Sequence, residues 1–443
     1  MKREKKVRIS MDNKTRTVSL VKSEFKKFIK FFLSELKPKG PILTPFNILS
    51  FVIIMTGIVI LVIRFAKGLG SVTNLSQEYP WGLWISFDVI TGVAFAGGAY
   101  VLCFMVYIMR IKKYHPIIRV TVLNGFLAYA FYAGALVFDL GRPWNIVNPI
   151  IGNSFGVSSV MFLVAWHFML YMMAEFIEFS PAVAEWLGWK RIRKILGTLT
   201  VGVVIFGITL STLHQSALGA LFLIAKSKIH PLWYTEFIPV LFFVSSIFAG
   251  LSMVIFEGSI SQRVFRHQIS PQNHAAHYGI VLSLAKICAG TMFVYLFLKI
   301  LVFFHGQHYS YLNTPLGYLF LTEILGFVLL PGILFTESVR RRNFGLIKIA
   351  AILTLVGIVM NRLNTSLITF NWQSAVKYYP TWMEIMVTLM IIFGEILVFR
   401  WIVNRMPILK ESPEWARSEE KTKRQPQTTK IEEENEEWKI SVI

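Results

Sequence analysis

Residues Phe138–Pro149 read FDLGRPWNIVNP and lie between two long apolar runs, Ile117–Val137 and Phe155–Phe179. Each run is long enough to cross the hydrocarbon core of a membrane, which takes ~20 apolar residues in a helix. The stretch between them is polar and carries an acid, a base, a glycine and a proline. It therefore marks the point where one hydrophobic helix leaves the membrane and the next one enters it.

This connection allows two interpretations. Asp139 and Arg142 are three residues apart, so they can form an ion pair if the helix continues that far. Gly141 and Pro143 then favour its end. The pair can be a simple salt bridge at a helix end, with Trp144 as an anchor at the membrane interface. Alternatively, it belongs to a binding site, and the rest of the sequence has to decide.

The same apolar pattern recurs along the whole chain. Of its 443 residues, 54% are apolar and 16% charged, and the mean hydropathy is +0.56, which is unusual for a soluble domain. Ten stretches are long enough to span a membrane: 46–66, 81–109, 116–140, 155–179, 194–217, 233–258, 274–304, 315–337, 344–362 and 380–403. We therefore predict an all-α, polytopic membrane protein, because helices satisfy their backbone hydrogen bonds within each span.

Basic residues alternate between the predicted connections, which gives an orientation. The even-numbered connections carry Arg110, Lys112, Lys113, Lys190, Arg191, Arg193, Lys194, Arg263, Arg266, Arg340, Arg341 and Arg342, whereas the odd-numbered ones are poor in base. By the positive-inside rule, both termini are expected in the cytoplasm of a bacterial inner membrane. The net charge of +20 lies mostly in tails and these connections, so it does not indicate nucleic-acid binding.

The composition divides the chain into three parts. Residues 1–44 form a basic tail, in which Val21–Leu36 is expected to make an amphipathic helix on the anionic inner leaflet. Residues 45–405 form the transmembrane domain. Residues 406–443 are polar and mixed in charge, and we expect them to be disordered.

Cysteine and histidine placement argues against a resident metal centre. Cys103 and Cys288 lie in separate spans and cannot supply the four thiolates of an iron–sulfur site. A bis-histidine haem needs two histidines at one depth. His167 is expected ~18 Å below the outer end of its span and His214 near the outer surface, so we expect no haem.

Asp88 stands about two turns inside the second span, among apolar residues and near Gly92, Gly97 and Gly98. The glycines allow another backbone or a flat ligand to come close. A carboxylate at this depth is costly and indicates a functional site, although a hydrogen bond that fixes helix packing is the alternative.

Five ionisable residues are expected near the outer face: Asp88, Asp139, Arg142, His214 and Arg362. They come from separate parts of the sequence. Their convergence on one side would suit the polar head group of a lipid-soluble ligand whose tail lies between the apolar spans.

Several segments carry a family resemblance. They are WGLWISFDVITGVAFAGGAYVL, VLNGFLAYAFYAGALVFDLGRPW, SVMFLVAWHFMLY, LSTLHQSALGALFL, HPLWY and MNRLN. Together they resemble the quinone-reactive membrane subunits of the NrfD/polysulfide-reductase superfamily, and within it the HybB type found with periplasmic nickel–iron hydrogenases. The resemblance covers about residues 45–405.

The resemblance implies a fold and partners. It implies two four-helix bundles with flanking helices, and no haem, flavin or metal in this chain. Electrons would pass through a periplasmic ferredoxin-like iron–sulfur subunit to or from menaquinone or ubiquinone in the lipid membrane. A hydrogenase, a molybdenum reductase or a multihaem cytochrome would lie beyond that subunit.

The resemblance also implies site residues. Arg119, Tyr129 and His214 match positions proposed in the family for quinone binding and proton transfer, and Asp88, Asp139 and Arg142 lie in its most recognisable motifs. From this we expect proton transfer by His214, Tyr129 and Asp88, and quinone binding by Arg119, Tyr129, Asp139, Arg142 and His214. Members associated with hydrogenases commonly have a glutamate where this chain has Leu163, which puts a proton route through that point in doubt.

The chemistry of these residue types fits a quinone. Quinone reduction consumes two electrons and two protons; an imidazole can hydrogen-bond a quinone oxygen and pass it a proton, and an arginine stabilises developing negative charge. A secondary transporter is the main rival function, because deep acids and glycine-rich spans also occur there. Clustering at the outer face rather than at the midplane argues against it.

Overall fold

The computed structural model describes residues 26, 29–148, 156 and 159–409. Within them, ten helical segments are long and apolar enough to cross a membrane, which confirms the predicted all-α polytopic fold. The first five spans are α2 (Pro45–Lys67); η2, α3, α4 and η3 (Trp84–Ile108); α5, η5 and α6 (His115–Asp139); α8 (Val160–Trp186); and α9 with η7 (Lys190–Ala225). The last five are α10 (Ile238–Val264); α11 (Pro271–Gly306); α12, η10 and α13 (Pro315–Arg341); α14 and η11 (Phe344–Ile368); and α15 (Trp382–Val403).

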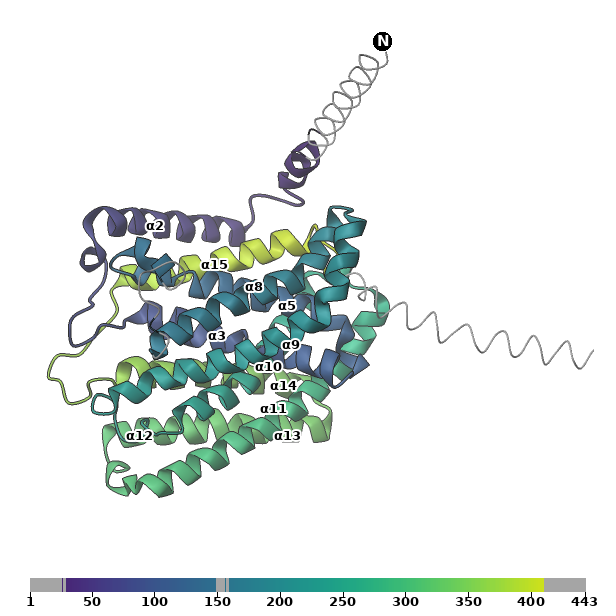
Figure 1. Ribbon diagram of the computed structural model, residues 1–443. Coiled ribbons are helices and arrows are strands. Elements are labelled where there is room, and N and C mark those ends of the chain that lie inside the picture. The colour runs from purple at the N-terminus through teal and green to yellow at the C-terminus, as the bar shows by residue number, and fades with distance from the viewer. Residues whose placement is uncertain (1–25, 27–28, 149–155, 157–158, 410–443) are drawn as a thin grey trace, which may run out of the picture. The chain divides into compact units, whose positions relative to one another are not determined.

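Spans two to nine form two four-helix bundles (Figure 1). In the first bundle, α4 packs on α5, α5 on α8, α8 on α9, and α9 back on α4. In the second bundle, α10 packs on α11, α11 on α13, α13 on α14, and α14 back on α10. The flanking helix α15 packs against α5, η5 and η2 of the first bundle, as the resemblance implied.

Glycines allow the two bundles to touch at backbone distance, where α4 of the first bundle crosses α10 of the second. A Cβ atom added to Gly250 would lie 1.9 Å from the amide nitrogen of Gly98. A Cβ atom added to Gly97 would lie 2.5 Å from the carbonyl oxygen of Ser246. No side chain fits at these points, so the expectation that another backbone comes close to the second span is confirmed.

Four spans depart from α-helical geometry where they carry polar residues. Wide, π-helical turns occur at η2 (Trp84–Thr91), η5 (Tyr129–Ala133), η10 (Thr322–Leu329) and η11 (Asn364–Ile368). These turns include Asp88, Tyr129, Glu323 and Asn364. Such irregular turns recur at functional sites because they re-aim side chains within a helix.

The ends of the bundles differ in composition. The basic end holds the connections with the alternating arginines and lysines named above, and the base-poor end holds the others. Connections at the base-poor end are tied together by a bridge between Ile229 and Phe370 and by the His230 amide, which donates to the carbonyl of Thr369 at 3.2 Å. Burial, together with the neighbouring His308, lowers the pKa of His230 to about 4.

The predicted tails lie largely outside the described residues. Of the expected amphipathic helix, residues 29–36 are described and are helical. At the other end, Met406, Ile408 and Leu409 are buried, so the chain stays packed slightly beyond the predicted boundary at residue 405.

Candidate functional site in the first bundle

A buried group of rings lies in the first bundle where η5, α8 and α9 meet. The ring centroid of Tyr129 is 5.6 Å from that of His214, 4.6 Å from that of Tyr171 and 5.9 Å from that of Phe168. The centroids of Phe168 and His214 are 6.1 Å apart. Tyr129 and His214 are almost completely inaccessible to solvent. The structure therefore brings together two of the residues that the sequence had singled out, and we call this set the ring cluster.

The ring cluster and its surroundings hold buried polar atoms that make no hydrogen bond of good geometry within the described residues, although Tyr129 lies within reach of Ser211 and Glu175 within reach of Tyr171. These are the hydroxyl of Tyr129, both ring nitrogens of His214, the hydroxyl of Ser211 and both carboxyl oxygens of Glu175. Next to them, Gln215 does have a partner, because its amide nitrogen donates to the carbonyl of Val93 at 2.8 Å. Buried polar groups are normally hydrogen-bonded to protein, water or ligand. Water or a ligand in contact with these atoms would complete their hydrogen bonding.

Carboxyl groups continue from the ring cluster toward the basic end. A Cβ atom added to Gly125 would lie 2.5 Å from Oε1 of Glu175, so the carboxyl occupies the space that this glycine leaves. One turn further along α8, Glu178 accepts a hydrogen bond from the thiol of Cys103 at 2.8 Å. Leu163, at the position where the family commonly has a glutamate, is 39% exposed. Glu175, not Leu163, is therefore the buried helix position facing this part of the bundle.

Arg119 lies nearer the basic end than the ring cluster. It is ten residues before Tyr129, or ~15 Å along the helix. Its guanidinium donates to Glu185 at 2.8 Å and to the carbonyl of Pro407 at 2.9 Å. Arg193 also pairs with Glu185. The structure thus places Arg119 in an ion-pair group at the basic end and not beside His214.

Asp88 and Asp139 lie on the side of α15 and α2. The hydroxyl of Thr388 donates to Oδ2 of Asp88 at 3.0 Å, while Oδ1 of Asp88 and Oδ1 of Asp139 have no partner among the described residues. Arg64, a buried arginine of α2, donates to the carbonyls of Phe138, at 2.8 Å, and Leu140, and interacts electrostatically with Asp139.

The predicted pair of Asp139 and Arg142 does not form in the part of the chain that the structure describes. The helix α6 ends at Asp139, and Leu140 has extended backbone angles, φ −64° and ψ 122°. This break removes the helical spacing on which the prediction depended. Arg142 is exposed, and Trp144 is exposed as well. The cation near Asp139 is Arg64.

Arg362 belongs to the second bundle. Its guanidinium donates to Asn361 at 2.8 Å and to the hydroxyl of Ser245 at 2.7 Å, and lies over the ring of Phe242 with its central carbon 3.6 Å from the ring centroid. Of the five ionisable residues expected near the outer face, only His214 belongs to the ring cluster. Asp88 and Asp139 lie on the side of α15 and α2, Arg142 is exposed, and Arg362 is held by second-bundle partners.

Sequence reasoning missed several buried ionisable residues. They are Arg64 in the first span, Glu323 in the eighth, and Glu384 in the tenth, where Glu395 is half-buried. All could have been found by the same signal that pointed to Asp88, because ionisable residues inside apolar spans are rare and mark partners or functional positions.

The two histidines considered for haem lie at one depth. His167 is seven residues after the start of α8 at Val160, and His214 is six residues before the end of α9 at Ala220, so each is ~10 Å from the base-poor end of its helix. They are close enough to interact electrostatically. The expectation of different depths is wrong, because α8 begins five residues later than predicted. Among the described residues, no group of three or more His, Cys, Asp or Glu side chains is placed to hold a metal.

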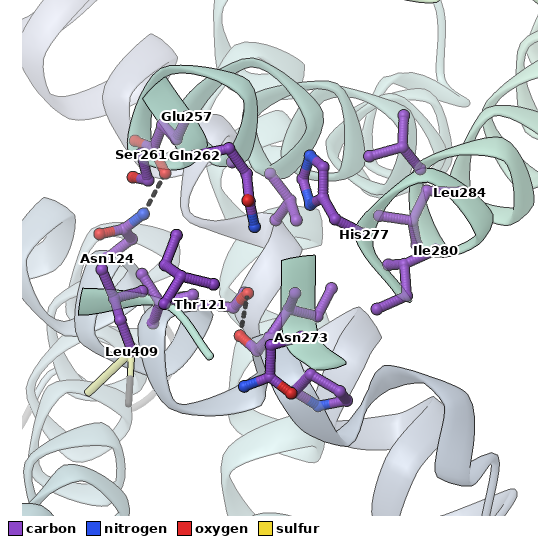
Figure 2. Close-up of a pocket in the computed structure, with 17 residues that line it drawn as sticks. Thr121, Asn124, Glu257, Ser261, Gln262, Asn273, His277, Ile280, Leu284 and Leu409 are labelled. Atoms are coloured by element: carbon purple, nitrogen blue, oxygen red, sulfur yellow. Dashed lines mark hydrogen bonds between the residues drawn. The ribbon is translucent and has the colours of Figure 1, made fainter. Parts of the chain in front are cut away.

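A cleft opens between α5, α10 and α11 at the basic end (Figure 2). Glu257 accepts a hydrogen bond from the amide of Asn124 at its inner part. His277, also on its wall, has a buried Nε2 atom without a partner among the described residues. A second, small cavity shares Asn124 and Glu257 with this cleft and extends to Tyr132 and Glu395.

Comparison with known proteins gives consistent matches. The family model described as polysulphide reductase, NrfD, matches residues 71–371. A protein of Nitratidesulfovibrio vulgaris is 43% identical over 84% of this chain and 97% of its own length. The probable Ni/Fe-hydrogenase 2 b-type cytochrome subunit of Escherichia coli K12 is 30% identical over 81% of this chain and 90% of its own. The menaquinone reductase integral membrane subunit of Nitratidesulfovibrio vulgaris is 27% identical, over 79% and 88%.

Proposed function

The chain belongs to the polysulphide reductase NrfD family and is a multi-pass membrane subunit of a respiratory oxidoreductase; on that premise we propose that it exchanges electrons with menaquinone or ubiquinone at the ring cluster. The names of two relatives, a hydrogenase subunit and a menaquinone reductase subunit, support a role beside a redox partner. They also favour this role over that of a secondary transporter.

The unsatisfied polar atoms of the ring cluster carry the proposal. A quinone presents two carbonyl oxygens on a flat ring, and reduction adds two electrons and two protons to form the quinol. The Tyr129 hydroxyl and a protonated nitrogen of His214 can each donate a hydrogen bond to such an oxygen. The rings of Phe168 and Tyr171 offer flat apolar surfaces next to them. The same atoms that lack partners in the protein are those a quinone would use.

His214 is the residue we assign to proton transfer at the quinone oxygen. An imidazole within hydrogen-bonding reach can donate a proton as negative charge develops on the oxygen and take one back in the reverse reaction. Tyr129 would position the quinone. Asp88, with one free carboxyl oxygen, would exchange protons with the site from the side of α15.

We assign the supply of protons to the basic end. The cleft at Glu257 and the cavity that follows it lead from His277 to Glu395, whose carboxyl lies within hydrogen-bonding reach of Tyr132. Tyr132 in turn is close enough to Asp88 to interact with it electrostatically. Protons taken up at the basic end while electrons arrive at the base-poor end would make turnover electrogenic.

The orientation follows from the charge alternation. We place the basic end in the cytoplasm and the base-poor end in the periplasm of a bacterial inner membrane, where a ferredoxin-like iron–sulfur subunit would dock and connect to a hydrogenase, molybdenum reductase or multihaem cytochrome. Reporter fusions after residues 148 and 190 should lie in opposite compartments; finding both in one compartment would contradict this orientation.

Haem b is the second candidate cofactor, favoured by the shared depth of His167 and His214 and by the name of the hydrogenase relative. A bis-histidine haem needs a porphyrin between two facing imidazoles. The rings of Tyr129 and Phe168 pack against His214 instead, which supports a chain without haem. A Soret band in stoichiometric amount in the purified subunit would overturn this part of the proposal.

The direct functional test is the change His214→Ala. It should leave the complex assembled but lower quinone-linked electron transfer ~10²-fold or more, since it removes a general acid–base group. Activity of the catalytic partner with an artificial dye should be unchanged. His230→Ala is the matched control, because His230 is equally buried but lies in the connection that joins the two bundles, outside the ring cluster. Its quinone activity per assembled complex should stay near that of the unmodified protein.

Two outcomes would contradict the proposal. The first is normal quinone activity per assembled complex in His214→Ala. The second is an equal loss in both variants and with the dye, which would mean that removing either histidine simply damages the fold.

A further inference from the structure

One face of α8 carries a line of polar residues from the ring cluster to the basic end. Tyr171, Glu175, Glu178 and Glu185 follow one another at intervals of four, three and seven residues, which places them on the same side of a helix. Glu185 pairs with two arginines, whereas Glu175 and Glu178 form no ion pair within the described residues. Acids inside a span are costly, so two of them on one face indicate a role beyond helix packing.

The end of this line at the basic end is open. Glu178 lines a cleft there, together with Arg119 and Arg193. The side chains of Arg119, Arg193 and Glu185 keep exposed fractions of 12%, 13% and 18%, so the mouth of the cleft is polar and accessible. Glu178 is half-buried and accepts a hydrogen bond from the thiol of Cys103 at 2.8 Å. It can therefore take up a proton from water that enters the cleft.

Glu175 continues the line one turn further into the bundle. It is buried, and its carboxyl occupies the space beside Gly125. It interacts electrostatically with Glu178 and lies within hydrogen-bonding reach of the hydroxyl of Tyr171. Neither of its oxygens makes a hydrogen bond of good geometry within the described residues. Glu175 thus stands between the cleft and the ring cluster, with oxygens that can receive and pass on a proton.

Hydroxyl groups complete the connection to His214. The Ser211 hydroxyl lies within hydrogen-bonding reach of both Tyr171 and Tyr129. Ser211 is one turn before His214 on α9, and the ring centroids of Tyr129 and His214 are 5.6 Å apart. A hydroxyl both donates and accepts hydrogen bonds, so it can release one proton while it takes up another. The line from the cleft to His214 therefore consists of groups that can carry protons.

We propose that these residues form a proton route from the basic end to the quinone, the α8 route; this inference rests on the function proposed above. Glu178 takes up a proton from water in its cleft, and Glu175 receives it. Glu175 in turn passes a proton to the hydroxyls of Tyr171 and Ser211. These hydroxyls return to His214 the proton that it has given to the quinone oxygen. Each residue ends in its starting protonation state, and the electrons come from the redox partner.

The α8 route and the route at Glu257 end at different groups. The route at Glu257 leads to Asp88, on the side of α15, whereas the α8 route leads to His214. Quinol formation takes two protons. Each route then supplies one of them, so closing either route limits turnover.

Changes that remove a titratable group and keep its size test the α8 route. In the assembled complex, Glu175→Gln and Glu178→Gln should each lower quinone turnover ~10-fold or more and leave dye-linked activity unchanged. Proton transfer should then limit the rate, so the ratio of turnover in H₂O to turnover in D₂O should rise. Glu178→Asp keeps a carboxyl in the cleft and should retain most of the turnover with the ordinary isotope ratio. A purely structural role would leave this ratio unchanged in every variant.

Thr200→Val is the matched control, because Thr200 lines the same cleft but carries no titratable group. Its turnover and its isotope ratio should equal those of the unmodified protein. A photoreactive quinone should still label the first bundle in both glutamine variants, since the α8 route supplies protons and does not hold the quinone. If Glu175→Gln does not assemble, Glu178→Gln decides alone, because Glu178 is half-buried at the cleft.

Two results would overturn the α8 route and leave the proposed function in place. One is normal turnover with an unchanged isotope ratio in Glu178→Gln. The other is an equal loss of turnover in Thr200→Val and Glu178→Gln, which would mean that any change in the cleft damages the complex. Failure of the proposed function itself would appear separately, as normal quinone turnover in His214→Ala.

Discussion

The two four-helix bundles bury polar residues in opposite ways. In the second bundle, Glu323 has three hydrogen-bond donors, and Arg362 has Asn361 and Ser245 as partners. In the first bundle, within the described residues, His214 and Glu175 make no hydrogen bond of good geometry, although Val164 and Tyr171 lie within reach of them. Both sets lie on or beside irregular helical turns, so the backbone does not distinguish them. The hydrogen bonding of the central carboxyl groups, Glu323 and Glu175, does distinguish them, although Nε of Arg362 and Oδ1 of Asn364 in the second bundle also lack partners among the described residues.

This difference separates buried polar groups that stabilise the fold from buried polar groups that are available to a ligand. A satisfied buried network fixes helix packing, and breaking it leaves charges without partners. A buried polar network with missing hydrogen bonds lowers the stability of the ligand-free protein, and it is retained where a ligand supplies those hydrogen bonds. In the proposed function, the first bundle is the reactive half of the subunit and the second is the supporting half, so changes in the two should have different consequences.

The largest expected effect is the loss of folded protein from Glu323→Ala. Removing one partner of a buried charged network costs ~3–5 kcal/mol, because Arg362 and Lys299 would remain without their carboxylate. The amount of assembled complex in membranes should fall steeply, whereas quinone activity per remaining complex should change little. Quantified immunoblots against the activity of the same membranes measure both. A full yield with inactive complexes would reverse the roles given to the two bundles.

Glu175→Leu is the corresponding change in the first bundle and should have the opposite profile. It removes a buried carboxyl that makes no hydrogen bond of good geometry within the described residues, so the thermal stability of the complex should stay the same or rise, by ~1 kcal/mol. Quinone-linked turnover should fall, because a titratable group next to the ring cluster is lost. Thermal unfolding of purified complex and turnover with quinone check the two parts. If Glu175→Leu lowered the stability as much as Glu323→Ala, the distinction between the two bundles would be contradicted.

A smaller effect is expected in the cleft between the bundles. Glu257→Gln keeps the size of the side chain and an oxygen for the amide of Asn124, but cannot carry a proton. We expect quinone turnover to fall ~10-fold and dye-linked activity to persist. Glu337→Gln is the control, since Glu337 pairs with Arg341 at the same end of the second bundle and lies outside the cleft. Equal quinone turnover in Glu257→Gln and Glu337→Gln would show that Glu257 does not take part in supplying protons.

Much of the fold could be predicted because its causes are local. The ten spans and the alternation of basic connections can be recognised from length and composition alone. The glycines of the second span predicted a close approach by another backbone, which is the crossing of α4 with α10. The ends of the helices were harder to predict from the sequence. The later start of α8 brought His167 to the depth of His214, and the break after Asp139 separated it from Arg142.

The site could be predicted only in part, because neighbours across the bundle cannot be read from one helix. Tyr129 and His214 were expected together and do meet. Arg64, which lies beside Asp139, is 75 residues away in the sequence, and no motif links the two. Similarly, Arg362 stands at the expected end of its span, but its partners Ser245 and Asn361 hold it in the second bundle.

Photoaffinity labelling of the assembled complex with a photoreactive quinone tests the central claim most directly. The label should attach to the first bundle, in peptides that contain Tyr129, Phe168 or His214, and an excess of unlabelled quinone should prevent it. Labelling should be weakened in His214→Ala and unchanged in His230→Ala. Labelling that quinone displaces from the second bundle alone, with the first bundle unmarked, would contradict the account.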